Sequence, residues 1–181
     1  MHSPPSDPAD LPAEPSSASD SPLAASIARQ EAILDRQLDW IKAVDSKTPI
    51  IIGLATAMLA VTGALSPAAK DLNWGTGLLM AMGSLPLVGC LAFCAAATFP
   101  HTDGPKDSLI YFGAICKMPF NAYSAKANAQ SEQGHLNDLN VQCYRNAQIA
   151  TAKYAAVQKA MLWLFIATPF WLIACYLLYK G

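Results

Sequence analysis

The amino-acid sequence predicts an all-α integral membrane protein with three transmembrane helices and a short cytoplasmic helical layer. Two observations lead to this prediction. The chain of 181 residues is 53% hydrophobic and 14% charged, whereas an ordinary soluble domain carries about 25% charged residues. Three windows also lack Asp, Glu, Lys and Arg for long enough to cross a hydrocarbon core about 30 Å thick, which takes about 20 helical residues.

The three windows give the spans in chain order. We expect the first span at residues 48–69, the second at 76–100 and the third at 160–179. Pro49 opens the apolar part of the first span and suits the first turn of a helix, where its missing N–H has no helical partner. A central Asp, Lys or Arg costs roughly 2.5 to 3.5 kcal/mol on insertion scales. The alternative, three helices buried in a soluble core, needs a larger core than this chain offers.

Two segments precede the first span. Residues 1–22 consist largely of Pro, Ser, Ala and Asp, which cannot bury enough apolar surface to offset chain entropy, so we expect a disordered tail. No Lys or Arg precedes Arg29, which argues against a secretory signal. In residues 23–47, Leu and Ile recur at helical spacing, which predicts an amphipathic cytoplasmic helix. It carries acids as well as bases, so packing on another helix is favoured over lying on the membrane surface.

The polar middle segment, residues 103–159, is predicted to form the cytoplasmic helical region. Residues 105–108 favour the start of a helix, and Pro119 is expected to end or kink it. From His135 an apolar stripe continues without a helix breaker until Pro169. We therefore expect one helix of about 40 residues, about 60 Å long, to run from the cytoplasm into the third span.

The distribution of positive charge predicts the orientation. Of the 12 Lys and Arg residues, ten lie before the first span or between the second and third, and only Lys70 and Lys180 lie on the other side. Positive residues near the ends of spans are retained in the cytoplasm. We expect the N-terminus and residues 103–159 to be cytoplasmic and the C-terminus to lie outside.

Ionisable residues gather at the cytoplasmic ends of the first and third spans. Asp45 and Lys47 precede the first span, and Lys153 precedes the third. Such groups are either snorkelling anchors or members of a functional pair. The anchor interpretation suits the lysines, but an acid gains nothing from the negative surface potential of the inner leaflet. We therefore hypothesise that Asp45 pairs with Lys153.

A polar stripe follows one face of the last long helix. Asp138, Gln142, Arg145 and Lys153 are spaced to lie on neighbouring turns. A solvated face explains this pattern, and so does a surface that faces a ligand or another protomer. The spacing alone leaves both interpretations open.

The sequence offers little for other kinds of chemistry. No Ser or Cys nucleophile has a base at motif spacing, and five Cys without CxxC spacing and three scattered His argue against a metal site. A net charge of -1 gives no sign of a nucleic-acid partner. We expect neither catalytic residues, nor a metal, nor a cofactor.

Several segments together resemble a known family. They are Asp45-Ser-Lys47 before the first span, Tyr111-Phe112-Gly113-Ala-Ile115 in the middle, and Leu136-Asn-Asp138-Leu139, Gln142, Ile149-Ala150 and Lys153-Tyr154 before the last span. In this order the chain resembles the Pycsar membrane effectors, the transmembrane effector half of a bacterial anti-phage system. The resemblance covers residues 34–178.

The resemblance implies a function. A partner cyclase would make a cyclic pyrimidine mononucleotide on infection, and the effector, activated by cyclic UMP or cyclic CMP, would impair the bacterial inner membrane and kill the cell by abortive infection. Because no strand-rich nucleotide-binding module is evident, the site would be built from helices, within one chain or between protomers, and a homo-oligomer is expected. The candidate ligand-binding or gating residues are Asp45, Lys47, Asp138, Gln142, Arg145, Lys153 and Tyr154.

Two alternatives stay open. One is a small helical membrane effector of another nucleotide-signalled defence system, a class that usually lacks the third span. The other is a structural or assembly subunit of the membrane that senses no ligand. A neighbouring cyclase gene would separate the sensing from the non-sensing interpretation.

Overall fold

The computed structural model describes residues 21–66, 73–99 and 104–180. Of these residues 88% are helical and none lies in a β-strand, which confirms the all-α fold. The predicted tail lies outside the described residues, apart from Ser21 and Pro22, which begin the first helix.

Helix α1 (Pro22–Leu65) is a single helix of 44 residues, about 66 Å long at 1.5 Å per residue. The Ser21 Oγ accepts a hydrogen bond from the Ala24 N–H at 3.0 Å and caps its first turn. Pro49 lies inside α1, so the prediction that it opens a helix was wrong. The chain continues the helix because residues on both sides of Pro49 pack against other helices, and the proline removes only a local hydrogen bond.

Helix α2 (Trp74–Thr98) has 25 residues, which corresponds to about 37 Å and is enough to cross a bilayer core. The Asn73 side chain accepts a hydrogen bond from the Gly75 N–H at 3.3 Å at its start. Pro86 lies inside the helix without ending it.

The helix expected to start at residues 105–108 is not formed. The chain makes a loop there because the buried Ser108 Oγ accepts hydrogen bonds from the N–H groups of Ile110 at 3.1 Å and Tyr111 at 2.9 Å. A hydroxyl that satisfies nearby amides in this way favours a turn. Helix α3 (Phe112–Ile115) follows. Pro119 caps the start of α4 (Phe120–Ala129) rather than ending a helix.

Helix α5 (Glu132–Lys180) has 49 residues, about 74 Å, and confirms that one helix runs from the polar middle segment through the last apolar window. The Ser131 Oγ accepts a hydrogen bond from the Gly134 N–H at 3.1 Å at its start. Pro169 lies inside α5 and does not end it.

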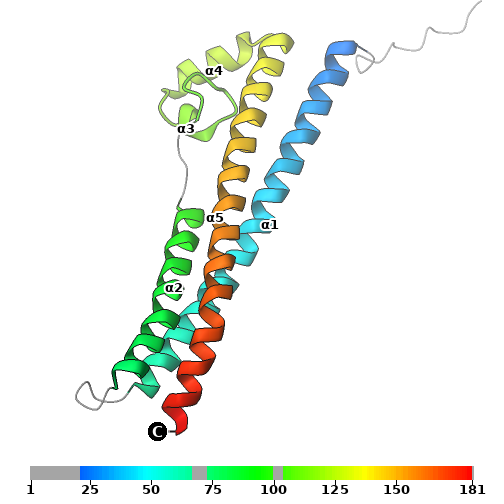
Figure 1. Cartoon of the computed structure of the whole chain (residues 1–181). Helices are drawn as coiled ribbons and strands as arrows, with labels where there is room; N and C mark the ends of the chain where they lie inside the picture. Colours follow the sequence, from blue (N-terminus) through cyan, green and yellow to red (C-terminus); the bar gives the residue numbers. More distant parts are fainter. Residues whose placement is uncertain (1–20, 67–72, 100–103, 181) are drawn as a thin grey trace, which may run out of the picture.

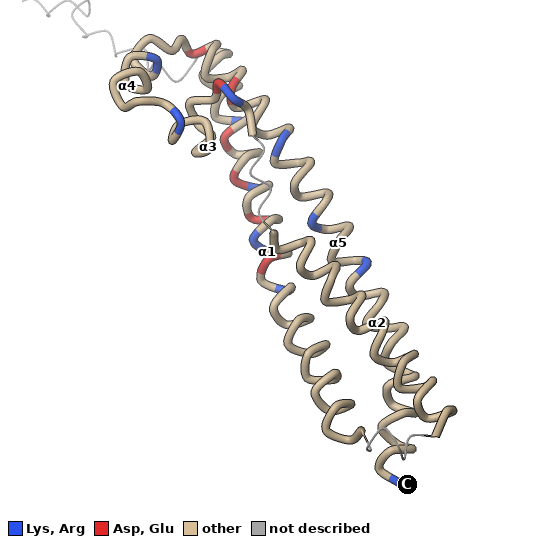
Figure 2. Tube along the Cα trace, turned by 90° about the vertical axis from the view of Figure 1, so that its left-hand side faces the viewer, with Lys and Arg blue, Asp and Glu red and all other residues tan. Residues whose placement is uncertain are grey.

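The molecule has two halves along its length. In the apolar half (residues 48–66, 73–99 and 160–180) α1, α2 and α5 lie together, and in the charged half (residues 21–47 and 104–159) α1 and α5 continue beyond the end of α2 while α3 and α4 lie beside α5 (Figure 1). Among the described residues, charged side chains are confined to the charged half except for Lys180 at the far end (Figure 2). In the part of the chain that the structure describes, three helices are long and apolar enough to cross a membrane, as predicted.

Small residues let α2 and α5 approach closely. Ala160 and Ala167 of α5 are fully buried, as are Cys90 and Cys94 of α2. A Cβ atom placed on Gly83 would lie 3.2 Å from the Trp171 backbone. Close backbone contact of this kind is the usual basis of helix association in membranes, where lipid removes most of the hydrophobic drive.

A polar contact joins α5 to α1 in the apolar half. The Trp171 Nε1–H donates hydrogen bonds to the Met58 carbonyl at 2.9 Å and to the Thr62 Oγ1 at 3.0 Å. The Thr62 hydroxyl itself donates to the Met58 carbonyl at 3.0 Å. The indole therefore keeps its polar N–H satisfied away from water while fixing the register of the two helices.

Candidate functional site

An ion pair joins α1 and α5 where the charged half meets the apolar half. The Lys153 Nζ lies 2.5 Å from the Asp45 Oδ1, so the predicted contact is confirmed, while its role in ligand binding or gating stays a prediction. The Lys153 side chain is 11% exposed and the Asp45 side chain 47% exposed. The ammonium therefore depends on the carboxylate as its partner, whereas the carboxylate also reaches water.

The helix around Asp45 has altered backbone bonding. Because Pro49 has no N–H, the carbonyl of Asp45 lacks its usual helical donor. Two hydroxyls also bond back to the chain, from Ser46 to the Ala43 carbonyl and from Thr48 to the Val44 carbonyl, both at 3.0 Å. Prolines and bonds of this type are where helices bend, so the ion pair lies beside a place in α1 where bending is favoured.

Lys47 does not join this pair. Its side chain is exposed on α1. Residues two apart on a helix do not share a face, so Lys47 and Asp45 lie on different faces of α1. Its position at the boundary of the two halves suits a snorkelling anchor.

Tyr154 lines a groove between α1 and α5. The groove has a volume of about 400 Å³, and its polar and aromatic lining residues are Gln37, Trp40, Thr151, Tyr154 and Gln158. The Gln37 Oε1 is buried and has no hydrogen-bond partner among the described residues, and the Trp40 side chain is 52% exposed. Sequence reasoning missed Gln37 and Trp40; a tryptophan among the polar residues of an amphipathic helix was the available signal.

Asp138 and Gln142 lie further along the charged half of α5. The Asp138 Oδ2 accepts a hydrogen bond from the Leu109 N–H at 2.7 Å, so this carboxylate anchors the loop at residues 104–111 to the helix. The Gln142 Oε1 is buried, and no residue in the described part of the chain forms a hydrogen bond with it. The predicted polar stripe is therefore not a uniformly solvated face.

Arg145 lies beside the same loop. It lines a cavity of about 370 Å³ with Gly104, Pro105, Val141 and Tyr144, and its Nη1 donates a hydrogen bond to the Gln148 Oε1 at 3.0 Å. The structure thus divides the predicted residues into two places: Asp45, Lys153 and Tyr154 at the boundary of the halves, and Asp138 and Arg145 under the loop.

The outer end of the charged half is closed by contacts between α1 and α5. The Cys143 Sγ donates a hydrogen bond to the Gln30 carbonyl at 3.5 Å, and the His135 Nε2 lies 3.7 Å from the Glu31 Oε1. Burial raises the pKa of the Cys143 thiol above its ordinary value, because the thiolate would lose its hydration there. The thiol is therefore protected while the helices stay together.

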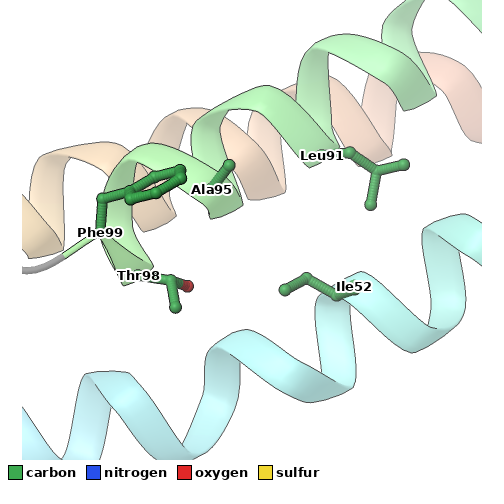
Figure 3. Close-up of a pocket in the computed structure, with 5 residues that line it drawn as sticks. All are labelled: Ile52, Leu91, Ala95, Thr98 and Phe99. Atoms are coloured by element: carbon green, nitrogen blue, oxygen red, sulfur yellow. The ribbon is translucent and has the colours of Figure 1, made fainter.

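A cavity of about 510 Å³ opens between α1 and α2 in the apolar half. Ile52 of α1 faces Leu91, Ala95, Thr98 and Phe99 of α2 across it (Figure 3). These residues carry no charge, so the cavity suits an acyl chain rather than a phosphate-bearing ligand.

The comparisons with known proteins identify the family. The chain matches the model of the Pycsar effector protein domain over residues 29–180. Comparison with curated proteins and with solved structures gave no match. The matched range includes most of α1, all of α2 and α5, and every candidate residue described above, and on this basis the chain belongs to the Pycsar effector family.

Proposed function

We propose that this membrane effector is activated by cyclic UMP or cyclic CMP and then impairs the inner membrane, killing the infected cell. Membership of the Pycsar effector family supports an anti-phage membrane effector with a partner cyclase. The observation that favours direct gating is α5, which runs without interruption from the charged half into the apolar half. A displacement at one end of a continuous helix reaches the other end.

In this proposal the described arrangement is the resting state. Contacts at the outer end and the pair of Asp45 with Lys153 hold α1 against α5. A ligand must favour the active state by about 10⁴-fold, or about 5.5 kcal/mol, to move the protein from about 1% to 99% active. A few charge-assisted hydrogen bonds to one phosphate, at about 1.5 to 3 kcal/mol each, supply that difference if they form only in the active state.

We further propose that the charged half is cytoplasmic, that Lys180 lies on the periplasmic side, and that the protein acts as a homo-oligomer without enzymatic activity. The enrichment of Lys and Arg in the charged half supports this orientation. Reporter fusions at residue 130 and after the C-terminus are expected to lie on opposite sides of the membrane. Two reporters on the same side would contradict a three-span topology.

The gating proposal is tested with the full-length protein in dye-loaded liposomes that contain anionic lipid. Cyclic UMP, cyclic CMP and cyclic AMP are added separately, with protein-free liposomes as the control. We expect dye release with a cyclic pyrimidine nucleotide and none with cyclic AMP. If no nucleotide changes dye release or conductance from a correctly inserted protein, direct gating is wrong and a non-sensing structural subunit is the better explanation.

A further inference from the structure

We propose that the nucleotide binds between residues 104–117, which comprise the loop at residues 104–111 and the following α3 turn, and the face of α5 that carries Tyr144 and Arg145. This inference rests on the proposed function. Two cavities adjoin there and share Gly104 and Pro105 as lining residues. Their volumes are about 340 Å³ and 370 Å³, each within the range of about 300 to 1,000 Å³ found for small-molecule sites.

The charge of this site matches a phosphate. Lys106 and Lys117 line the first cavity and Arg145 the second. The described lining residues of the two cavities include no Asp or Glu, and the Asp138 carboxylate under the loop accepts the Leu109 N–H. Arg offers a planar fork of donors to phosphate oxygens and Lys a compact positive charge, which makes the combination a suitable receptor for one phosphodiester.

Aromatic rings stand beside the positive charges. The centroids of the Tyr111 and Phe112 rings lie 4.9 Å apart. The chain closes tightly around the Tyr111 ring: a Cβ on Gly104 would lie 2.3 Å from this ring, and a Cβ on Gly113 would lie 2.5 Å from it. The Tyr144 side chain on α5 is 69% exposed although it lies in the charged half, outside the predicted spans. A flat nucleobase can stack on such an exposed ring.

The site also connects the loop with the membrane helices. The hydrogen bond from the Leu109 N–H to the Asp138 carboxylate fixes the loop on α5. One wall of the site belongs to the loop and the other to α5. Cys143, which contacts the Gln30 carbonyl of α1, directly precedes Tyr144. A ligand held between the walls would therefore act on α5 next to its contact with α1.

The groove between α1 and α5 that contains Trp40 and Tyr154 is the rival location. Its described lining residues include aromatic rings and amides but no Lys or Arg. A base would find partners there, whereas the phosphate would find no cation. The charge of the ligand therefore favours the loop site.

The test measures binding of cyclic UMP, cyclic CMP and cyclic AMP to the full-length protein in nanodiscs by calorimetry. The variants are Lys117→Gln, Arg145→Gln and Tyr144→Ala. The matched control is Lys126→Gln, which removes the same charge from α4 but does not line either cavity. We expect each of the three variants to weaken binding of the cyclic pyrimidine nucleotide about tenfold or more, and the control to bind like the wild type.

Each result has one meaning, provided that all variants keep the wild-type melting temperature. If the wild type binds and the three variants bind like Lys126→Gln, the site is elsewhere and this inference is wrong, while the proposed function stands. Loss of binding in Trp40→Ala alone would place the ligand in the rival groove, and this result would also overturn the inference. If the wild type binds no cyclic pyrimidine nucleotide, the proposed function fails, and the inference fails with it.

Discussion

Breaking the pair of Asp45 with Lys153 should destabilise the protein by an amount that depends on which partner is removed. Asp45→Ala leaves an ammonium that is 11% exposed without its carboxylate. Leaving a charged group without a partner in a mostly buried place costs at least 1 to 3 kcal/mol, and about 3 to 5 kcal/mol when burial is complete. We expect about 2 kcal/mol, because the remaining exposure admits some water.

Removing the other partner should cost less. Lys153→Met keeps most of the apolar stem and leaves a carboxylate that is 47% exposed, which water can solvate. We expect a loss of about 0 to 1 kcal/mol, as for an exposed pair. The double variant should resemble Lys153→Met alone, which gives a coupling energy of about 2 kcal/mol, equal to the loss in Asp45→Ala.

The assay is thermal unfolding in detergent, followed with a thiol-reactive dye that reports exposure of the fully buried Cys90 and Cys94 in a Cys116→Ser background. At about 2 to 4 °C per kcal/mol for a chain of this size, Asp45→Ala should lower the melting temperature by about 4 to 8 °C. Asp39→Ala is the matched control, since Asp39 and Lys42 form a pair at 3.1 Å whose side chains are 71% and 75% exposed. An equal loss in Lys153→Met and Asp45→Ala, or additive losses, would refute the reasoning.

Three further predictions concern packing and reactivity. Trp171→Phe keeps a ring but removes the two hydrogen bonds to α1, and should cost about 1 kcal/mol, or about 2 to 4 °C in the same assay. Gly83→Ala places a Cβ 3.2 Å from the Trp171 backbone, whereas a Cβ on Gly53 meets nothing within 4 Å. Gly83→Ala should therefore cost about 1 to 3 kcal/mol and Gly53→Ala nothing. Equal melting temperatures of the two variants would count against close packing of α2 on α5. Iodoacetamide at pH 8 should label the exposed Cys116 well before the buried Cys143. Burial raises the pKa of the Cys143 thiol, so the unreactive thiol form persists at this pH. Mass spectrometry of the labelled peptides gives the order.

Features with a local cause in the sequence were predicted correctly. The apolar windows and the unbroken stripe after His135 gave the three long helices and the continuity of α5, because helical periodicity and charge are properties of neighbouring residues. The contact of Asp45 with Lys153 followed from the same information, since the two spans bring their charged ends to one level.

Features that depend on which surfaces meet were not predicted. Pro49 continues α1 because α5 supports the helix on both sides of it. The loop at residues 104–111 depends on one hydroxyl, that of Ser108, satisfying two amides. The loop site and the groove with Gln37 and Trp40 combine residues from segments far apart in the chain. No periodicity within one segment indicates such a combination.

The contacts between the helices differ in kind, and this difference predicts which helix moves in the proposed activation. The α2–α5 interface is closed by small buried residues and by the approach of Gly83 to the Trp171 backbone, which resists separation because tightly packed interfaces have few intermediate arrangements. The α1–α5 interface has separable polar contacts at successive levels, from Cys143 with Gln30 to Asp45 with Lys153.

We therefore expect α1 to move relative to a fixed pair of α2 and α5. A Glu31→Cys/His135→Cys variant in a Cys116→Ser background, made at side chains that lie 3.7 Å apart and are 55% and 35% exposed, is joined by a short bifunctional maleimide. It should insert normally but release little dye when a cyclic pyrimidine nucleotide is added, while the same variant without crosslinker should behave like the wild type. The comparison is a link between cysteines placed at Phe93 and Trp163, whose rings lie 6.4 Å apart across the α2–α5 interface, and it should leave release intact. If the link to α1 leaves release intact and the link between α2 and α5 abolishes it, the moving element is α5 or α2. Ala97 of α2 packs with Val44 and Val157 at the inner end of the charged half, whereas α1 and α5 continue through that half beyond the end of α2. The polar contacts between α1 and α5 are therefore where a ligand bound in the charged half can separate the two helices.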